Sequence, residues 1–121
     1  MRALRARTYI RASIARYVTD NQLDAVIAPI APGTAVPADD LHVVGDDGSR
    51  EHVSLAYTRL TMPFNATGQP TLAVPCGKDR TGLPIGMQIV GRPHAEALIC
   101  RIGAAYEAAV GGFRMASFSQ T

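Results

Sequence analysis

The sequence of 121 residues contains no tryptophan, one lysine, two cysteines and no apolar run near the roughly 20 residues needed to span a membrane. Its first ten residues also lack the apolar core of a secretory signal. These absences argue against a membrane span and predict a cytoplasmic protein. Cys76 and Cys100 lack the spacing of a metal site, so we expect reduced, structural thiols that fill small buried spaces.

Histidines and acidic residues also fall in no pattern that would hold a metal ion. His42, His52 and His94 lack the spacing of zinc ligands, and the acids within residues 39–47 lack the alternation of a calcium loop. We therefore expect no metal and no cofactor. Cys76 as a nucleophile with His94 as its base is a minor alternative, because nothing in the sequence brings the two together.

Positive charge is concentrated at one end of the chain. The first 20 residues carry five arginines and one aspartate, whereas the rest carries seven basic and nine acidic residues. The formal net charge of +2 therefore comes from the first segment, and the body lacks the basic footprint of a nucleic-acid-binding protein. We expect no nucleic-acid partner and no membrane partner.

Apolar periodicity predicts helices and three short strands, which indicate an α/β layer architecture in a single segment, residues 1–121. The predicted elements are a helix at 2–19, a strand at 25–30, a possible hairpin within 41–54, a helix from Ser54 to about 60 ended by Pro63, strands at 71–75 and 84–90, and a helix at about 94–110 stopped by Gly111 and Gly112. We expect the first strand to be covered on both faces and the sheet edges to need neighbours. Residues 112–121 are predicted to form a loose tail.

The two long helices carry different signals. The first has an apolar stripe made of Ile10, Ile14, Tyr17 and Val18. It begins, however, with Arg2, Arg5 and Arg7, where a helix start favours a capping residue and acids. We therefore expect residues 1–20 to be a truncated basic helix, with an Arg-rich transit peptide as the alternative. The closing helix is predicted to have an apolar side made of Ala97, Leu98, Cys100, Ile102, Ala105, Tyr106 and Ala109.

Three blocks of the sequence carry a family resemblance, in order and with fitting spacing. They are DAVIAPIAPGTA, TRLTMPFNATGQPTLAVPCG and GLPIGMQIVGRPHAEALICRIGAAYE. The pattern residues are Asp24, Pro29, Thr61, Pro63, Asn65, Gly68, Pro70, Pro75, Gly77, Gly82, Leu83, Pro84, Gly86, Gln88, Gly91, Glu96 and Glu107. In these blocks the chain resembles the C-terminal part of an amidase-signature enzyme, a family related to the tRNA amidotransferase A subunit.

The resemblance implies part of an α/β/α sandwich around a mixed sheet. It also implies hydrolysis of a carboxamide to a carboxylate and ammonia or an amine, by a serine that a second serine and a buried lysine activate. In the family, that machinery precedes the region present here. The only lysine, Lys78, lies in a predicted polar turn, and none of the five serines lies beside another. We expect the chain to be inactive alone, which leaves open whether it is itself an enzyme.

The segment from Thr61 to Asn65 approaches the acyl pocket in similar enzymes, so the resemblance implies that it forms a pocket wall. The candidate substrate-binding residues are Thr58, Met62, Phe64 and Asn65. The alternative is that Met62 and Phe64 belong to the core and that Asn65 caps local backbone. Glutamine-using relatives carry an aspartate at the position of Thr58, which grips the substrate's amino group, so a generic amidase fits better than a glutaminase.

The expected partners depend on which function holds. As an amidase segment, the chain would meet a small amide substrate only within the full-length enzyme, beside the missing N-terminal segment. The alternative is a non-catalytic α/β module that associates with itself or with a partner through unpaired sheet edges. On the chain alone, we expect an exposed apolar face larger than roughly a few hundred Å².

Overall fold

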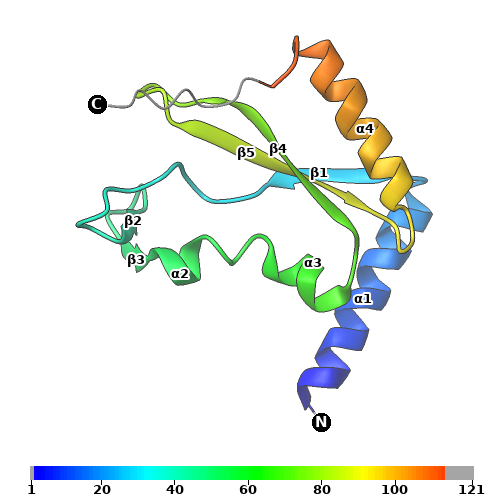
Figure 1. Ribbon diagram of the computed structural model, residues 1–121. Coiled ribbons are helices and arrows are strands. Elements are labelled where there is room, and N and C mark those ends of the chain that lie inside the picture. The colour runs from blue at the N-terminus through cyan, green and yellow to red at the C-terminus, as the bar shows by residue number, and fades with distance from the viewer. Residues whose placement is uncertain (1, 114–121) are drawn as a thin grey trace.

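The computed structural model describes residues 2–113, which form helices packed on an antiparallel sheet (Figure 1). The elements are α1 (Arg2–Asp20), β1 (Ala25–Pro29), β2 (His42–Val44), β3 (Arg50–His52), α2 (Val53–Ala56), α3 (Met62–Thr67), β4 (Thr71–Lys78), β5 (Pro84–Gly91) and α4 (Glu96–Ala109). The predicted α/β class is confirmed, and the bounds of α1 and β5 agree with the sequence to within one residue. No helix in the described part of the chain is long and apolar enough to cross a membrane.

The main sheet has three strands in the order β1–β5–β4, with both pairings antiparallel. Ala25 of β1 lies opposite Gly91 of β5, and Thr71 of β4 lies opposite Val90. In Figure 1, α4 and the pair α2–α3 lie on opposite sides of this sheet. The central strand β5 therefore faces two different environments, because successive side chains of a strand point to opposite faces.

A strand irregularity and a hairpin turn shape the edges of the fold. An irregularity between Pro75 and Gly77 shifts the register of β4 against β5, and beyond it β4 continues to Lys78, past its predicted end. The hairpin of β2 and β3 is confirmed, with Gly48 in its turn at a φ of 78°. That value is in the left-handed region, which glycine adopts without steric cost.

The core lies between the sheet and α4. Val74, Ile89 and Ile99 form its buried centre, and Ile89 has no exposed surface. A Cβ atom on Gly103 would lie 2.4 Å from Leu72 Cδ2, so the absence of a side chain there lets α4 approach β4 closely. Burying apolar side chains of this size stabilises a fold by roughly 1.5–3 kcal/mol each.

The predicted apolar side of α4 is wrong in part. The helix buries Ile99 and Gly103, which the prediction did not include, and it half-buries Leu98, Ile102 and Tyr106. The other predicted members are exposed: Ala97, Cys100, Ala105 and Ala109. Alanine fits either side of a helix, so the contact stripe is set by the larger side chains and by the close approach at Gly103.

Both cysteines are free and exposed, so the prediction of buried thiols is wrong. Cys76 lies within the irregularity of β4, which is an edge strand of the sheet in the described part of the chain, and its side chain is exposed. Cys100 lies on the solvent side of α4. An apolar sequence context does not bury a residue when it belongs to an edge strand or to the outer face of a helix.

The segment after the hairpin forms two short helices, where the sequence predicted one. The side chain of His52, and not of Ser54, accepts the capping hydrogen bond, from Ser54 N at the start of α2. Pro63 stands in the first turn of α3 and does not end a helix. Proline suits this position because the first backbone N–H groups of a helix have no partner within it. Gly68, at a φ of 74°, ends α3 in the left-handed conformation.

Several apolar side chains remain uncovered. Ile27 of β1 is 62% exposed, so the expectation that this strand is covered on both faces is wrong. Of the predicted stripe on α1, Val18 is buried, whereas Ile10 and Tyr17 are exposed. Large exposed apolar side chains therefore lie on α1, on β1 and in the segment of α2 and α3, and also on the β2–β3 hairpin and near the β4–β5 turn.

The closing helix ends where the sequence predicted. Gly111 and Gly112 both have positive φ, at 82° and 88°, directly after α4. Of the tail predicted at 112–121, residues 114–121 lie outside the described part of the chain. Phe113 packs against Tyr106, with ring centroids 5.9 Å apart.

Candidate functional site

The four candidate substrate-binding residues lie on the connection between α2 and α3 and on α3 itself. Thr58 and Met62 line an open groove of about 430 Å³. Phe64 and Asn65 belong to the same segment but do not line the groove; Phe64 is half-buried and Asn65 is exposed. The structure thus brings two of the four predicted residues to one surface.

The groove is lined mostly by apolar side chains. Its remaining lining residues are Ile10, Glu51, Leu55, Arg59, Pro63 and Ala66, drawn from α1, β3, α2, α3 and their connections. The charges of Arg59 and Glu51 are paired with each other across the lining. The Thr58 hydroxyl donates a hydrogen bond to the Ser54 carbonyl at 2.7 Å. The groove therefore offers an apolar surface and no unpaired ionic group.

The segment that carries the groove is tied to the sheet by the side chain of Gln88. This residue, on the central strand β5, is 1% exposed. Its Nε2 donates to the Pro29 carbonyl at 2.8 Å and to the Leu60 carbonyl at 3.0 Å. Both acceptors are carbonyl oxygens, which fixes the orientation of the amide. Leu60 directly precedes the predicted wall, so Gln88 sets the position of that wall against β1.

The other end of the Gln88 amide is unpaired. Its Oε1 atom is buried without a hydrogen-bond donor in the described part of the chain. Buried polar side-chain atoms are usually paired, and an unpaired acceptor costs on the order of 1–3 kcal/mol. The sequence offered a signal for this residue, since a glutamine stands alone in the apolar run PIGMQIV, but its role as a tether was not predicted.

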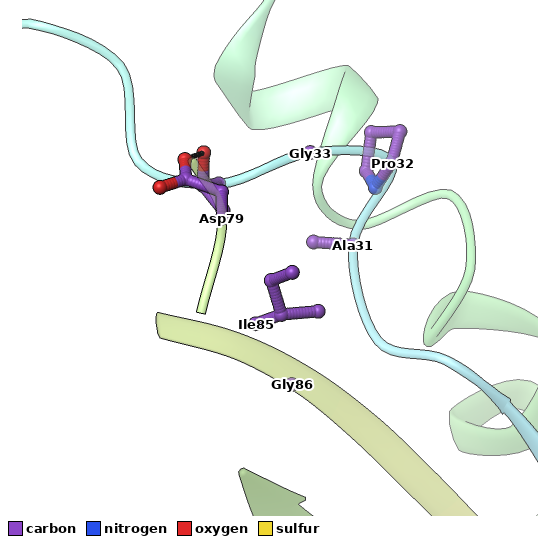
Figure 2. Close-up of a pocket in the computed structure, with 7 residues that line it drawn as sticks. Ala31, Pro32, Gly33, Asp79, Ile85 and Gly86 are labelled. Atoms are coloured by element: carbon purple, nitrogen blue, oxygen red, sulfur yellow. Dashed lines mark hydrogen bonds between the residues drawn. The ribbon is translucent and has the colours of Figure 1, made fainter. Parts of the chain in front are cut away.

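A second hollow, of about 370 Å³, lies beside the turn between β4 and β5 (Figure 2). The loop after β1 contributes Ala31, Pro32, Gly33 and Thr34 to it, and the hairpin contributes Asp79, Ile85 and Gly86. Figure 2 shows the side chains of Ala31, Asp79 and Ile85 around this space. A hydrogen bond between Thr34 and Asp79 links the loop after β1 to the β4–β5 hairpin at this hollow.

Asp79 accepts hydrogen bonds on both of its carboxylate oxygens. Thr34 Oγ1 donates to Oδ2 at 2.7 Å, while Thr81 donates to Oδ1 from its hydroxyl and its backbone N–H, and Leu83 N adds a third bond there. The Thr34 hydroxyl, followed by Thr81, lowers the pKa of Asp79 from 3.8 to about 2. The carboxylate is therefore ionised at neutral pH and cannot donate a proton, so its arrangement is that of a turn-stabilising residue.

The histidines of the β2–β3 hairpin lie near an acid and a serine but do not form a catalytic triad. Asp40 contacts His42 Nδ1 at 3.0 Å, whereas Ser54 Oγ lies 2.8 Å from Nδ1 of the other histidine, His52. The two rings meet edge to face, with centroids 5.6 Å apart. In a triad one imidazole joins the acid and the nucleophile. Here both contacts are local in sequence, and the His42–Asp40 contact is partly buried while the His52–Ser54 contact is exposed. Such local contacts are typical of turn and cap interactions.

Lysine and serine, the residue types that the resemblance assigns to catalysis, do not lie in a catalytic arrangement in the described part of the chain. Lys78 is exposed at the end of β4, and the Ser13 hydroxyl donates to the Tyr9 carbonyl within α1. Within residues 2–113, no group of three or more His, Cys, Asp or Glu side chains is placed to hold a metal ion. The arrangement of groove, tether and sheet thus defines a segment of an α/β protein that carries an open apolar groove.

Comparison with known proteins identifies the family. The amidase family model matches residues 1–100. The chain is 41% identical over 107 residues to the A subunit of the glutamyl-tRNA(Gln) amidotransferase from Myxococcus xanthus, a match that covers 88% of this chain and 20% of that protein. The chain belongs to the amidase family, and it spans about a fifth of the length of the curated relatives that it matches.

Solved structures give the same result for the fold. An amidase crystal structure matches with a TM-score of 0.78 at 30% identity, over 88% of this chain and 24% of that one. An inhibitor-bound chain from a vestigial protein complex, described in connection with the origins of an s-triazine catabolic enzyme, matches with a TM-score of 0.82 at 29% identity. That match covers 96% of this chain and 25% of the other, so the fold is that of part of an amidase.

Proposed function

We propose that the chain acts as a structural and pocket-wall segment of an amidase that hydrolyses carboxamide C–N bonds. Membership of the amidase family carries this proposal. In the whole amidase, β1, β4 and β5 are part of the sheet of a larger α/β/α sandwich, and the segment from Thr58 to Asn65 forms one side of the substrate pocket. The chain alone is inactive, because its exposed Lys78 is not desolvated and cannot serve as the base that activates a serine.

The lining of the groove supports a neutral substrate. Thr58 stands where glutamine-using relatives are expected to carry an aspartate, and its hydroxyl is bonded to local backbone. The side chains of Ile10, Leu55 and Met62 make the surface apolar. An apolar lining favours the hydrocarbon part of an acyl group and offers no counter-ion for an α-amino group. The substrate class is therefore a carboxamide with an uncharged acyl group.

Ammonia release from simple aliphatic carboxamides tests the proposal. The purified chain should release none above a protein-free blank. Mixing it with the rest of the 30%-identical amidase, expressed without the region that this chain matches, should restore turnover. Sustained turnover by the chain alone would refute the proposal, and so would a folded complementary part that neither binds the chain nor gains activity. In the restored mixture, Met62→Trp should raise KM for longer acyl groups more than for acetamide.

A non-catalytic module that associates with itself is the second candidate. The observation that favours it is the number of large exposed apolar side chains, among them Leu4, Tyr9, Ile27 and Met62. Exposed apolar surface of this kind marks interaction sites or unfilled neighbours. A stable closed oligomer by sedimentation, together with no turnover after complementation, would support this candidate over the first.

A further inference from the structure

The backbone of the sheet shows which groups face outward at its two edges. Ile30 N donates to the Gly86 carbonyl at 3.3 Å, and Gly91 N donates to the Pro70 carbonyl at 2.9 Å. Hydrogen-bonded and non-bonded pairs alternate along an antiparallel ladder, so these two bonds fix the pattern for both pairings. On β1 the outward residues are Ala25, Ile27 and Pro29, and on β4 they are Thr71, Ala73 and Pro75.

The outer edge of β4 has the features that discourage pairing with another strand. Pro75 lacks a backbone N–H in the outward row, and the irregularity at Cys76 interrupts the strand directly after it. Lys78 then places a charge at the end of the strand. Proline, bulges and lysine are the devices by which natural sheets protect their edges. Only Thr71 and Ala73 leave a short regular stretch, which makes β4 a terminal strand.

The outer edge of β1 has the opposite character. Its register against β5 is regular from Ala25 to Pro29, and the strand carries no charged residue. Ile27 lies opposite Ile89, on the same face of the sheet, yet α4 buries Ile89 and leaves Ile27 62% exposed. Ile27 thus presents a β-branched side chain together with a backbone N–H and C=O that have no partner within residues 2–113. An added strand would cover this surface.

Gln88 limits the length of this edge. Pro29 has no N–H, and its carbonyl accepts the hydrogen bond from Gln88 Nε2. The row of outward groups therefore ends after Ile27. A strand that pairs with β1 can form its ladder on Ala25 and Ile27 and must turn away before Pro29.

We propose that β1 is the edge at which the sheet continues, and that its occupant is an extended strand from the rest of an amidase domain. This inference rests on the proposed function. The occupant follows from the lengths of the relatives, since the matched amidase structure has about three-quarters of its chain outside this fold. That strand bonds to the backbone of Ala25 and Ile27 and brings an apolar side chain or helix over Ile27, while β4 stays unpaired.

Amide hydrogen exchange tests the assignment. In the chain alone, the Ala25 and Ile27 amides should exchange at least tenfold faster than Val26 and Ala28, which face β5. When the complementary part of the 30%-identical amidase is added, the Ile27 amide should become at least tenfold more protected. Ile27→Pro should abolish the complex without unfolding the chain, since the lost N–H faces outward, whereas the matched variant Ala73→Pro on β4 should leave the complex intact.

Each result decides one part of the inference. If the Ile27 amide were as protected as the Val26 amide in the monomeric chain, β1 would not be an open edge. Protection gained at Thr71 and Ala73, with none at Ile27, would show that the sheet continues at β4 and not at β1. Protection that rises with the concentration of the chain alone would make a second copy the occupant. Restored amidase turnover with an unprotected Ile27 would refute only this inference, whereas absence of both binding and turnover would count against the proposed function as well.

Discussion

Two regions of the chain differ in how far they can hold themselves together. The sheet–α4 unit, made of β1, β4, β5 and α4, contains a continuous core around Val74, Ile89 and Ile99. The helical arm, made of α1, α2 and α3, has only three buried residues, Val18, Ala56 and Thr67. Its α2 and α3 have four and six residues, far shorter than isolated helices that are stable in water. The arm, which carries the candidate pocket wall, therefore depends on contacts with other parts of the protein.

Two polar bridges join the regions. Gln88 of the sheet holds the Leu60 carbonyl of the arm. The second bridge consists of two hydrogen bonds that share Thr34. The Tyr57 hydroxyl donates to the Thr34 carbonyl, and the Thr34 hydroxyl donates to Asp79 in the β4–β5 turn. The sheet–α4 unit therefore supplies stability, while the bridges position the candidate pocket wall.

The largest expected effect comes from Ile89→Ala, which removes the most buried side chain of the core. It should lower the free energy of unfolding by about 2–5 kcal/mol, through lost burial and the cavity that remains. Chemical denaturation followed by circular dichroism measures the change. The matched control is Ile27→Ala, directly opposite on β1 and 62% exposed, which should change stability by less than about 0.5 kcal/mol. Equal losses at the two positions would show that burial beneath α4 does not set the stability of the sheet–α4 unit.

A smaller effect is expected from Gln88→Met, which keeps the length of the side chain and removes both hydrogen bonds to Pro29 and Leu60. The unpaired carbonyls should cost about 1–3 kcal/mol, reduced by removal of the unpaired Oε1. NMR should show shift changes concentrated from Leu60 to Asn65 and in the groove. If the changes were confined to the neighbours of Gln88 in the sheet, the tether would not position the wall. Gln88→Glu should be more destabilising at neutral pH, because a carboxylate would face two carbonyl oxygens.

The sequence predicted the parts of this fold that depend on local signals. The periodicity of residues 2–20 and 84–91, and the paired glycines after α4, place those elements within one or two residues. The division between α2 and α3 was missed because Pro63 is compatible with either the end or the first turn of a helix, and only the surrounding packing decides. Exposure of Cys76 and Ile27 was missed for a related reason, since an apolar run does not show which strand lies at an edge.

The candidate site was predictable to a similar extent. The motif pointed to the segment from Thr61 to Asn65, and the structure places Met62 with Thr58 at one groove. The bridges are contacts between residues far apart in the chain, 28 positions for Gln88 and Leu60 and 45 for Thr34 and Asp79. A single sequence shows that such polar residues need partners but does not identify the partners.

The smallest expected effect concerns the Asp79 bridge. Because folding lowers the pKa of Asp79 from 3.8 to about 2, its ionisation stabilises the folded chain above the unfolded pKa, and this contribution is lost as pH falls from about 4 towards 2. Thr34→Val removes the hydroxyl that contributes most to this shift, so an NMR titration should show the Asp79 pKa rising towards 3.8. The variant should also lose less stability than the parent chain over that pH range.

The two chains must be compared directly, because folding also lowers the pKa values of Asp40 and Asp47. Tyr57→Phe serves as the control. It removes the bond to the Thr34 carbonyl and should loosen α2 while leaving the Asp79 titration unchanged. An Asp79 pKa that stayed near 2 in Thr34→Val would assign its stabilisation to Thr81 and Leu83 within the turn. The second bridge would then end at Thr34, and Gln88 would be the principal polar link between the helical arm and the sheet–α4 unit.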